Sequence, residues 1–163
     1  DIDCIGAQNF LSLAHGDRTL HPPTAQAVVE LLTSIHVSLS GLFTVIIGDG
    51  FFGRQIALRL LNEDATVLLA NSKTTNLVHI TKQADVIVTA LGKPGFLTGS
   101  LIKKGSVIVD VGITKKGNKV LGDVDVESVS KKAYALTPVP GGVGPVTIAL
   151  LMKNTLSRAL DQS

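Results

Sequence analysis

The amino-acid sequence predicts an α/β domain in which a parallel sheet has helices on both faces and a last helix closes the chain. Short apolar runs rich in β-branched residues recur along the sequence, helix-period patterns alternate with them, and a glycine-rich turn follows the first run. This alternation is typical of parallel sheets covered on both sides. A chain of 163 residues that is 45% hydrophobic is large enough for one domain with its own core.

The first forty residues combine an irregular opening with one helix. Pro22-Pro23 predicts a turn into this helix, with Thr24 as a candidate N-cap. Apolar residues then share one helix face up to Leu32, and Ser40-Gly41 breaks the pattern. Beyond this point, strands are expected at 43–47, 65–70, 85–90, 106–110 and 134–137. Helices are expected at 53–61, 75–83 and 145–158, where Pro145 suits a first turn.

Composition excludes several classes of function. Lys+Arg 15 against Asp+Glu 13 leaves a formal charge of only +2, and aromatic residues make up 4%. A nucleic-acid interface needs a basic face or stacking aromatics, and the sequence has neither. No apolar stretch approaches the roughly 18–20 residues of a membrane span, and the aliphatic content argues against disorder. We therefore expect a soluble globular domain with no nucleic-acid or membrane partner.

The start of the chain supports two expectations. Cys4 is the single cysteine, so it cannot form an internal disulfide, and we expect it to be inert. The chain opens on Asp1 with no signal peptide, so we expect it to be a piece of a longer protein.

A glycine-rich loop is the first functional motif. The segment from Gly48 to Gly53 reads Gly-Asp-Gly-Phe-Phe-Gly and lies between a predicted strand and a predicted helix. This is the context of the dinucleotide fingerprint of Rossmann-like folds. There Gly48 permits a tight turn, Gly50 lets a pyrophosphate approach the backbone, and Gly53 allows close helix–strand packing. The alternative is a glycine turn that binds nothing.

Cofactor choice is usually determined at the end of the second strand. Asn71-Ser72-Lys73 stands there without a carboxylate. A hydroxyl beside a lysine suits the 2′-phosphate of NADP, so Ser72 and Lys73 favour NADP, and NAD is retained as the second candidate. The alternative for Lys73 is an ordinary solvent-facing lysine.

A proline–glycine segment from Thr137 to Pro145 is the most unusual stretch of the chain. It reads Thr-Pro-Val-Pro-Gly-Gly-Val-Gly-Pro and stands between the last predicted strand and the last helix. Prolines restrict the backbone and glycines permit positive φ. In open α/β sheets, ligands bind at such strand ends. The alternative is a simple connector.

This segment resembles the bifunctional methylenetetrahydrofolate dehydrogenase/cyclohydrolase family. The similarity extends to Val109-Asp110-Val111-Gly112-Ile113, Gly122-Asp123-Val124 and the opening Asp1-Ile2-Asp3. Further matching segments follow in the same order: Ala65-Thr66-Val67, Asn71-Ser72-Lys73-Thr74, Ala84-Asp85 and Gly92-Lys93-Pro94.

The resemblance implies a cytoplasmic enzyme of folate one-carbon metabolism. Such enzymes oxidise 5,10-methylenetetrahydrofolate by hydride transfer to NADP and hydrolyse the methenyl product to 10-formyltetrahydrofolate. The resemblance also implies a homodimer and a tetrahydrofolate derivative as substrate. Residues 1–40 would form an interdomain segment and helix beside the folate cleft, and residues 41–163 the NAD(P)-binding Rossmann domain.

The resemblance also assigns site residues. By the resemblance, the dinucleotide site would comprise Gly48, Asp49, Gly50, Ser72 and Ile113, and the glycine motif and the strand end add Gly53 and Lys73. The folate would be bordered by Asp3, Pro138, Val139, Pro140, Gly141 and Gly142.

Several positions depart from the family pattern. The family loop usually begins Gly-Arg-Ser, whereas Gly48-Asp49-Gly50 is one residue shorter overall and replaces the arginine with a carboxylate. The family His-Ser pair is Asn71-Ser72 in this chain, and Cys4 replaces a glycine. These departures indicate a divergent member or an altered cofactor preference.

The family's catalytic lysine belongs to a Tyr-x-x-x-Lys segment of a preceding domain. The single tyrosine, Tyr134, is followed four residues later by Pro138, so this segment is missing from the chain. No histidine has a catalytic partner pattern, and no metal-ligand spacing occurs. We therefore expect the cofactor-binding part of the enzyme, with no catalytic residue of its own and an N-terminal domain elsewhere.

Two other functions remain open from the sequence. A non-catalytic dinucleotide-sensing module is favoured by the Gly-Asp-Gly loop, and an upstream Tyr-x-x-x-Lys segment would argue against it. A Rossmann domain of another dehydrogenase is the third hypothesis, and the proline–glycine segment argues against that one.

Overall fold

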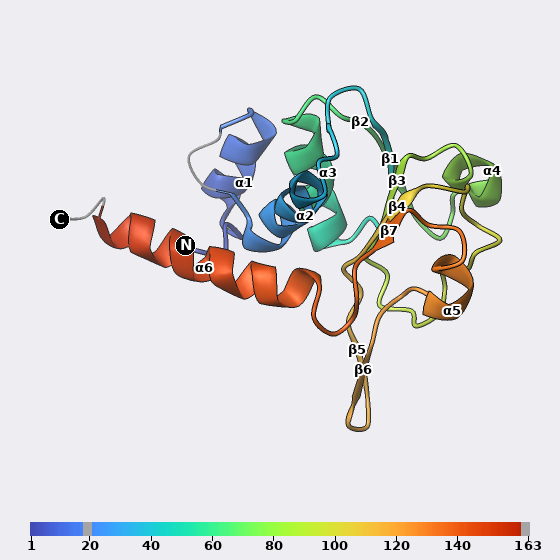
Figure 1. Cartoon of the computed structure of the whole chain (residues 1–163). Helices are drawn as coiled ribbons and strands as arrows, with labels where there is room; N and C mark the ends of the chain where they lie inside the picture. The colour runs from blue at the N-terminus through green and yellow to red at the C-terminus, as the bar shows by residue number, and fades with distance from the viewer. Residues whose placement is uncertain (18–20, 161–163) are drawn as a thin grey trace.

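A five-stranded parallel sheet forms the centre of the computed structural model, which describes residues 1–17 and 21–160 (Figure 1). Its strands are β1 (Phe43–Ile47), β2 (Thr66–Ala70), β3 (Val86–Thr89), β4 (Val107–Asp110) and β7 (Ala135–Leu136). They lie in the order β2-β1-β3-β4-β7, and every neighbouring pair is parallel. The predicted parallel sheet is confirmed, and its strand bounds are within two residues of those expected.

The central strands are buried on both faces. All four residues of β3 and of β4 are buried, as expected for strands that helices cover on both sides. The pairing of β1 with β3 places Ile47 opposite Thr89, so these two strands end at the same level. Strand β2 lies at the sheet edge, where Leu69 is exposed.

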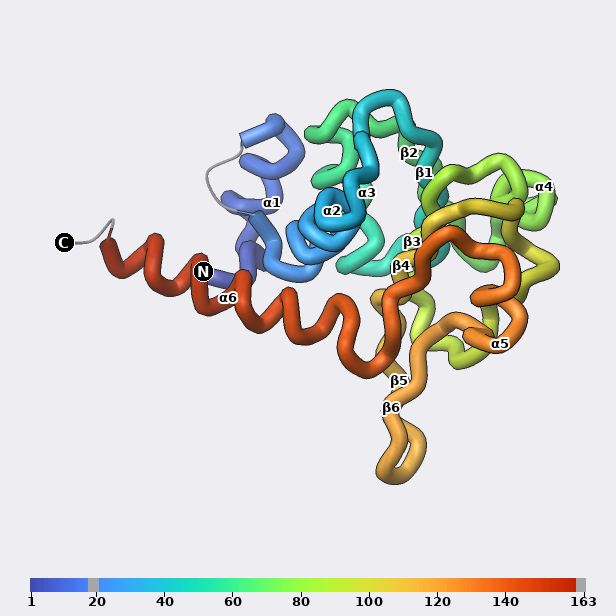
Figure 2. Tube along the Cα trace, in the orientation of Figure 1, coloured from blue at the N-terminus to red at the C-terminus, as the bar shows by residue number. Residues whose placement is uncertain are grey.

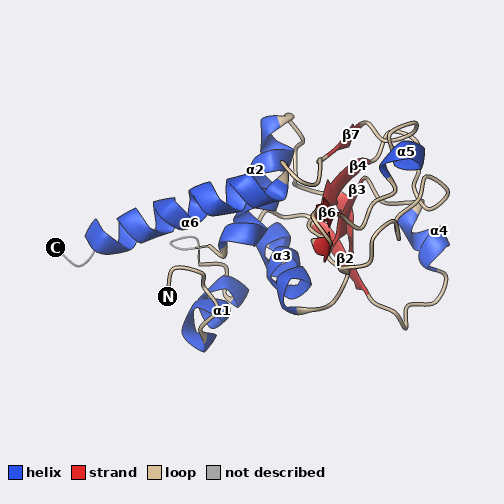
Figure 3. Cartoon of the chain, turned by 90° about the horizontal axis from the view of Figure 1, so that it is seen from below, coloured by secondary structure: helices blue, strands red, loops and turns tan. Residues whose placement is uncertain are grey.

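Two layers of helices enclose the sheet (Figure 3). On one face, α2 (Pro23–Ser34), α3 (Phe51–Leu61) and α6 (Val143–Leu160) pack over a core that includes Ile46 and Val88. The short helices α4 (Leu77–Thr81) and α5 (Val126–Val129) lie on the other side, where Leu77 and Val129 contribute to a second core. The predicted closing helix is confirmed. It packs against α2, and its last turns extend beyond the sheet and past α2 (Figure 2).

The structure contains elements that the sequence analysis did not predict. These are α1 (Ala7–Ala14), α5 and a hairpin of β5 (Thr114–Lys116) with β6 (Lys119–Leu121). The hairpin projects away from the sheet (Figures 1 and 2). The prediction of Thr24 as an N-cap is wrong, because α2 begins at Pro23 with Pro22 at its N-cap; proline fits there because the first helical N–H groups have no intrahelical partner.

The expected division at residue 40 stays a prediction. Helix α2, which precedes it, packs into the same core as α3 and α6. Among the described residues, no helix has the length and apolar character needed to cross a membrane.

Candidate functional site

The loops that could bind a ligand lie at one edge of the sheet. Because all five strands are parallel, their carboxyl ends share this edge, and residues 48–50, 71–74, 90–93, 111–113 and 137–142 follow them. The chain runs from β1 to β2 on one side and then returns to β3 on the other. Ligands of open α/β sheets bind at such a reversal of strand order. Gly48 after β1 and Ala90 after β3 flank this point.

The glycine loop has three different requirements for glycine. Gly48 has a φ of 123°, and a Cβ there would collide with the backbone of Ala90. A Cβ on Gly53 would lie 2.9 Å from the carbonyl carbon of Gly48 and closer still to its oxygen. Gly50, by contrast, is exposed, and a Cβ on it would meet nothing within 4 Å. The loop thus combines tight packing at its two ends with an open approach in the middle, at the N-cap of α3.

This geometry suits a pyrophosphate. The first backbone N–H groups of α3 lack intrahelical acceptors, and the helix dipole favours an anion at this end. An incoming phosphate could approach Gly50 as closely as the backbone permits. The residues present therefore fit the dinucleotide that the motif predicts.

Asp49 connects the glycine loop to the end of β2. Its carboxylate Oδ2 accepts a hydrogen bond from Asn71 Nδ2 at 3.0 Å. Asn71 Oδ1 in turn accepts the backbone N–H of Lys73 at 2.8 Å, and Asn71 N donates to Thr74 Oγ1 at 2.9 Å. The structure therefore brings Asp49 together with the predicted Ser72-Lys73 segment, and both Ser72 and Lys73 are exposed.

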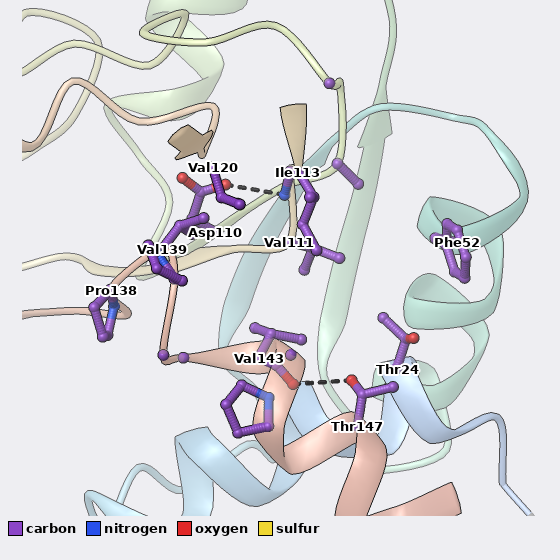
Figure 4. Close-up of a pocket in the computed structure, with 18 of the residues that line it drawn as sticks. Thr24, Phe52, Asp110, Val111, Ile113, Val120, Pro138, Val139, Val143 and Thr147 are labelled. Carbon is purple, nitrogen blue, oxygen red and sulfur yellow. Dashed lines mark hydrogen bonds between the residues drawn. The ribbon is translucent and has the colours of Figure 1, made fainter. Parts of the chain in front are cut away.

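A largely apolar pocket of about 670 Å³ continues along the same edge (Figure 4). Of the predicted site residues, Ile113 and all of 138–142 line it. Ile113 is 61% exposed, which excludes the alternative that it belongs to the core. Gly48 adjoins the pocket through Ala90, whereas Ser72 and Lys73 lie further along the edge and are not part of its lining.

Sequence reasoning missed several pocket residues. Phe52 lies at the start of α3, and Thr24 and Thr147 come from the facing helices α2 and α6 (Figure 4). Phe52 stands inside the glycine motif, and Thr24 follows the proline pair, so these two sequence features could have pointed to them. Ala90 and Val111 directly follow strands, so the rule that ligands lie at strand ends could have found them.

Two buried carboxylates hold the pocket loops in place. Asp110 accepts hydrogen bonds from the Gly112, Asp123 and Val124 amides and from Thr89 Oγ1, all at 3.0–3.1 Å. Burial raises the pKa of Asp110, and the hydrogen bonds from the two downstream amides and the threonine oppose that rise. Because its oxygens are occupied by these donors, Asp110 positions the loops.

Asp123 plays the same part for the loop after β3. Its carboxylate accepts the N–H groups of Leu91, Gly92 and Lys93 at 2.6, 3.2 and 2.6 Å. A Cβ on Gly112 would collide with this carboxylate, as would one on Gly122 with that of Asp110. The Asp-Val-Gly and Gly-Asp-Val motifs are thus explained by this packing.

Asp3 is not brought to the pocket. It is exposed and absent from the pocket lining. Its neighbours are fixed elsewhere: Asn154 Nδ2 donates to the Ile2 carbonyl at 3.0 Å, and Gln55 Nε2 donates to the Cys4 carbonyl at 3.2 Å. Its contact with a folate stays a prediction. Within residues 1–17 and 21–160, no group of His, Cys, Asp and Glu side chains could hold a metal ion.

The parallel sheet, its switch point and the glycine loop define a dinucleotide-binding domain of the doubly wound α/β class. The family model "Tetrahydrofolate dehydrogenase/cyclohydrolase, NAD(P)-binding domain" matches residues 22–163. The chain belongs to this family and is its NAD(P)-binding domain.

Similar proteins agree with this assignment. The chain is 45% identical to the bifunctional protein FolD of Campylobacter hominis over 99% of its own length and 58% of the relative's. It is 43% identical to FolD of Nitratiruptor sp. over 98% of its own length and 57% of the relative's. The chain thus spans less than two thirds of these proteins.

Solved structures show the same likeness. The bifunctional FolD enzyme of Campylobacter jejuni aligns with a TM-score of 0.95 at 42% identity, covering 100% of this chain and 59% of the other. The Trypanosoma brucei enzyme, solved in complex with NADP and an inhibitor, aligns with a TM-score of 0.89 at 38% identity, covering 98% and 59%.

Proposed function

We propose that this chain is the cofactor-binding part of a longer enzyme that oxidises 5,10-methylenetetrahydrofolate and hydrolyses the methenyl product to 10-formyltetrahydrofolate. The observation that carries the proposal is the continuity of the site. The apolar pocket at the ends of β3, β4 and β7 adjoins the glycine loop through Ala90 and Gly48. A dinucleotide needs such a long site with different chemistry at its two ends.

Each part of the edge would hold one part of the dinucleotide. The amides at the start of α3 and the open backbone at Gly50 would bind the pyrophosphate. Asn71, Ser72 and Lys73 would border the adenosine ribose. Ile113 and residues 138–142 would surround the reactive end and the folate beside it.

The nicotinamide, when bound, accepts the hydride that the oxidation releases. This chain's residues orient the two reactants and exclude water from the pocket, and positioning alone contributes much of the rate in such reactions. The hydrolytic step requires a titratable group within hydrogen-bond reach of the substrate. The resemblance assigns that group to the Tyr-x-x-x-Lys segment of another domain, so the chain by itself would not hydrolyse the methenyl compound.

Exposed apolar side chains on α6 favour the presence of a further domain in the longer protein. Ile148, Met152 and Leu156 follow one another at helical spacing and are 57%, 68% and 62% exposed; Ile148 also lines the pocket, and the other two lie beyond it. A row of exposed large apolar side chains is typical of a surface that another part of a protein covers. The relatives' additional length is consistent with such a domain. A homodimer and a cytoplasmic location stay predictions from the resemblance.

The full-length protein tests the proposal. We expect NAD(P)H formation that depends on 5,10-methylenetetrahydrofolate, and its loss in Gly50→Val. A full-length protein that binds a dinucleotide but catalyses neither step would instead favour the sensing module. Met152→Glu serves as the interdomain probe, since it should leave dinucleotide binding by this chain unchanged and reduce turnover in the full-length protein.

A further inference from the structure

The carboxylate of Asp49 lies at the place where dinucleotide sites distinguish NAD from NADP. In the doubly wound fold, an acidic side chain at the end of the second strand accepts hydrogen bonds from the adenosine ribose, and a phosphate on the 2′-hydroxyl meets repulsion there. This chain has no acidic residue in Asn71-Ser72-Lys73. The hydrogen bond from Asn71 Nδ2 holds the Asp49 carboxylate at that strand end instead.

Asp49 is held from both its backbone and its side chain. Its backbone carbonyl accepts a hydrogen bond from Arg54 Nε at 2.9 Å, and its Oδ2 is occupied by Asn71. Its Oδ1 accepts no hydrogen bond from any residue in the described ranges and is therefore available to a ribose hydroxyl. Because these two hydrogen bonds restrain Asp49, which is half-buried, we expect its carboxylate to stay close to an incoming phosphate.

Two cationic side chains near Asp49 would attract a 2′-phosphate and so act against its repulsion. Arg54 and Lys73 are both exposed, and neither forms an ion pair with Asp49 within the described part of the chain. Attraction by long, exposed side chains is weakened by solvent and by salt. Arg54 is held beside the glycine loop through its Nε, but both Arg54 and Lys73 are exposed to solvent, so we expect repulsion by the half-buried Asp49 carboxylate to dominate.

We propose that Asp49 makes this domain prefer NAD to NADP by accepting the adenosine ribose hydroxyls and repelling a 2′-phosphate. The inference rests on the proposed dinucleotide site and adds the residue that determines its selectivity. Ser72 and Lys73 would still contact a 2′-phosphate when NADP is bound, but against the charge of Asp49.

The test is a calorimetric titration of the 163-residue chain with NAD and with NADP. We expect NAD to bind at least about fivefold more tightly at low salt, and Asp49→Asn to shift the affinity ratio at least about tenfold toward NADP. Asparagine keeps the size of the side chain and can still accept the hydrogen bond from Asn71. Asp64→Asn is the matched control: Asp64 is exposed just before β2, at the opposite edge, and the ratio should stay within about twofold.

Salt supplies a second readout with a predicted sign. In the wild-type chain, added NaCl should improve NADP binding relative to NAD, because it screens repulsion. In Asp49→Asn, the same addition should weaken NADP relative to NAD, because only attraction by Lys73 and Arg54 is left.

Tighter NADP binding by the wild-type chain, or an unchanged ratio in Asp49→Asn, would overturn the role of Asp49 and leave the dinucleotide site standing. Failure of the wild-type chain to bind either nucleotide would overturn the proposed site and this inference together.

Discussion

Replacing Gly53 with alanine tests the close approach of α3 to β1 that the glycine loop requires. The added Cβ would lie 2.9 Å from the Gly48 carbonyl carbon and closer to its oxygen, and no flexible side chain separates the two backbones. The helix must move away from the strand, although Ile56 and Leu60 are fully buried beneath it. Such overpacking costs about 3 kcal/mol, and the better helix propensity of alanine offsets about 1 kcal/mol.

The expected net loss of stability is therefore about 2 kcal/mol, which lowers Tm by about 4–8 °C in a chain of this size. Thermal unfolding followed by circular dichroism measures it. Gly50→Val is the paired variant: its Cβ has open space, and the backbone at residue 50 is extended. We expect it to lose less than about 1 kcal/mol yet to abolish dinucleotide binding. A Tm for Gly53→Ala within about 1 °C of wild type would refute the packing argument, and unchanged affinity in Gly50→Val would refute the placement of the pyrophosphate.

Three further predictions concern the ribose end, an ion pair and the activity of the chain. Ser72→Ala combined with Lys73→Ala should weaken NADP more than NAD in titrations, since only NADP carries the 2′-phosphate; equal losses would exclude recognition by these residues. The hydrogen bond from Lys103 holds the pKa of Asp85 below its usual range, so this pair stabilises the fold above the unfolded pKa and ceases to do so as pH falls through the folded one. Lys103→Gln should thus lower the free energy of unfolding at pH 7, measured by urea denaturation, by less than about 1 kcal/mol, because the pair is partly exposed. The free energies of the variant and the wild type should converge in acid; a pH-independent difference would contradict the linkage. Finally, the isolated chain should show no cyclohydrolase activity in an assay of methenyltetrahydrofolate hydrolysis, and clear turnover would contradict the assignment of that step to another domain.

The sheet was predictable because burial on both faces leaves a strong local pattern. Val86–Thr89 and Val107–Asp110 are short, apolar and β-branched, and each became a fully buried strand. The hairpin of Thr114–Lys116 and Lys119–Leu121 carries mainly lysines and few apolar residues, so hydrophobic periodicity gave no signal for it. Helix α1 was missed for a related reason: it is short, and Leu13 is its one buried residue.

The residues of the candidate site likewise divide into those that a local sequence pattern marks and those that only the folded chain brings together. Ile113 stands at a strand end and residues 138–142 stand in a motif, so local patterns mark them, and they line one pocket. The contact between Asp49 and Asn71 joins residues 22 positions apart, and no local pattern encodes it. The anchoring of loops by Asp110 and Asp123 likewise depends on buried hydrogen bonds between distant segments.

The central claim is that a dinucleotide lies along the carboxyl edge of the sheet, from the end of β2 to the proline–glycine segment. Amide proton–nitrogen correlation spectra of the isotopically labelled chain, recorded during titration with NAD, test it most directly. We predict that the largest shifts occur in the loops that follow the strands: 48–53, 71–74, 90–92, 111–113 and 141–142. Shifts confined to the opposite edge, around Asp64 and Gly105, or no shifts at saturating NAD, would contradict the account.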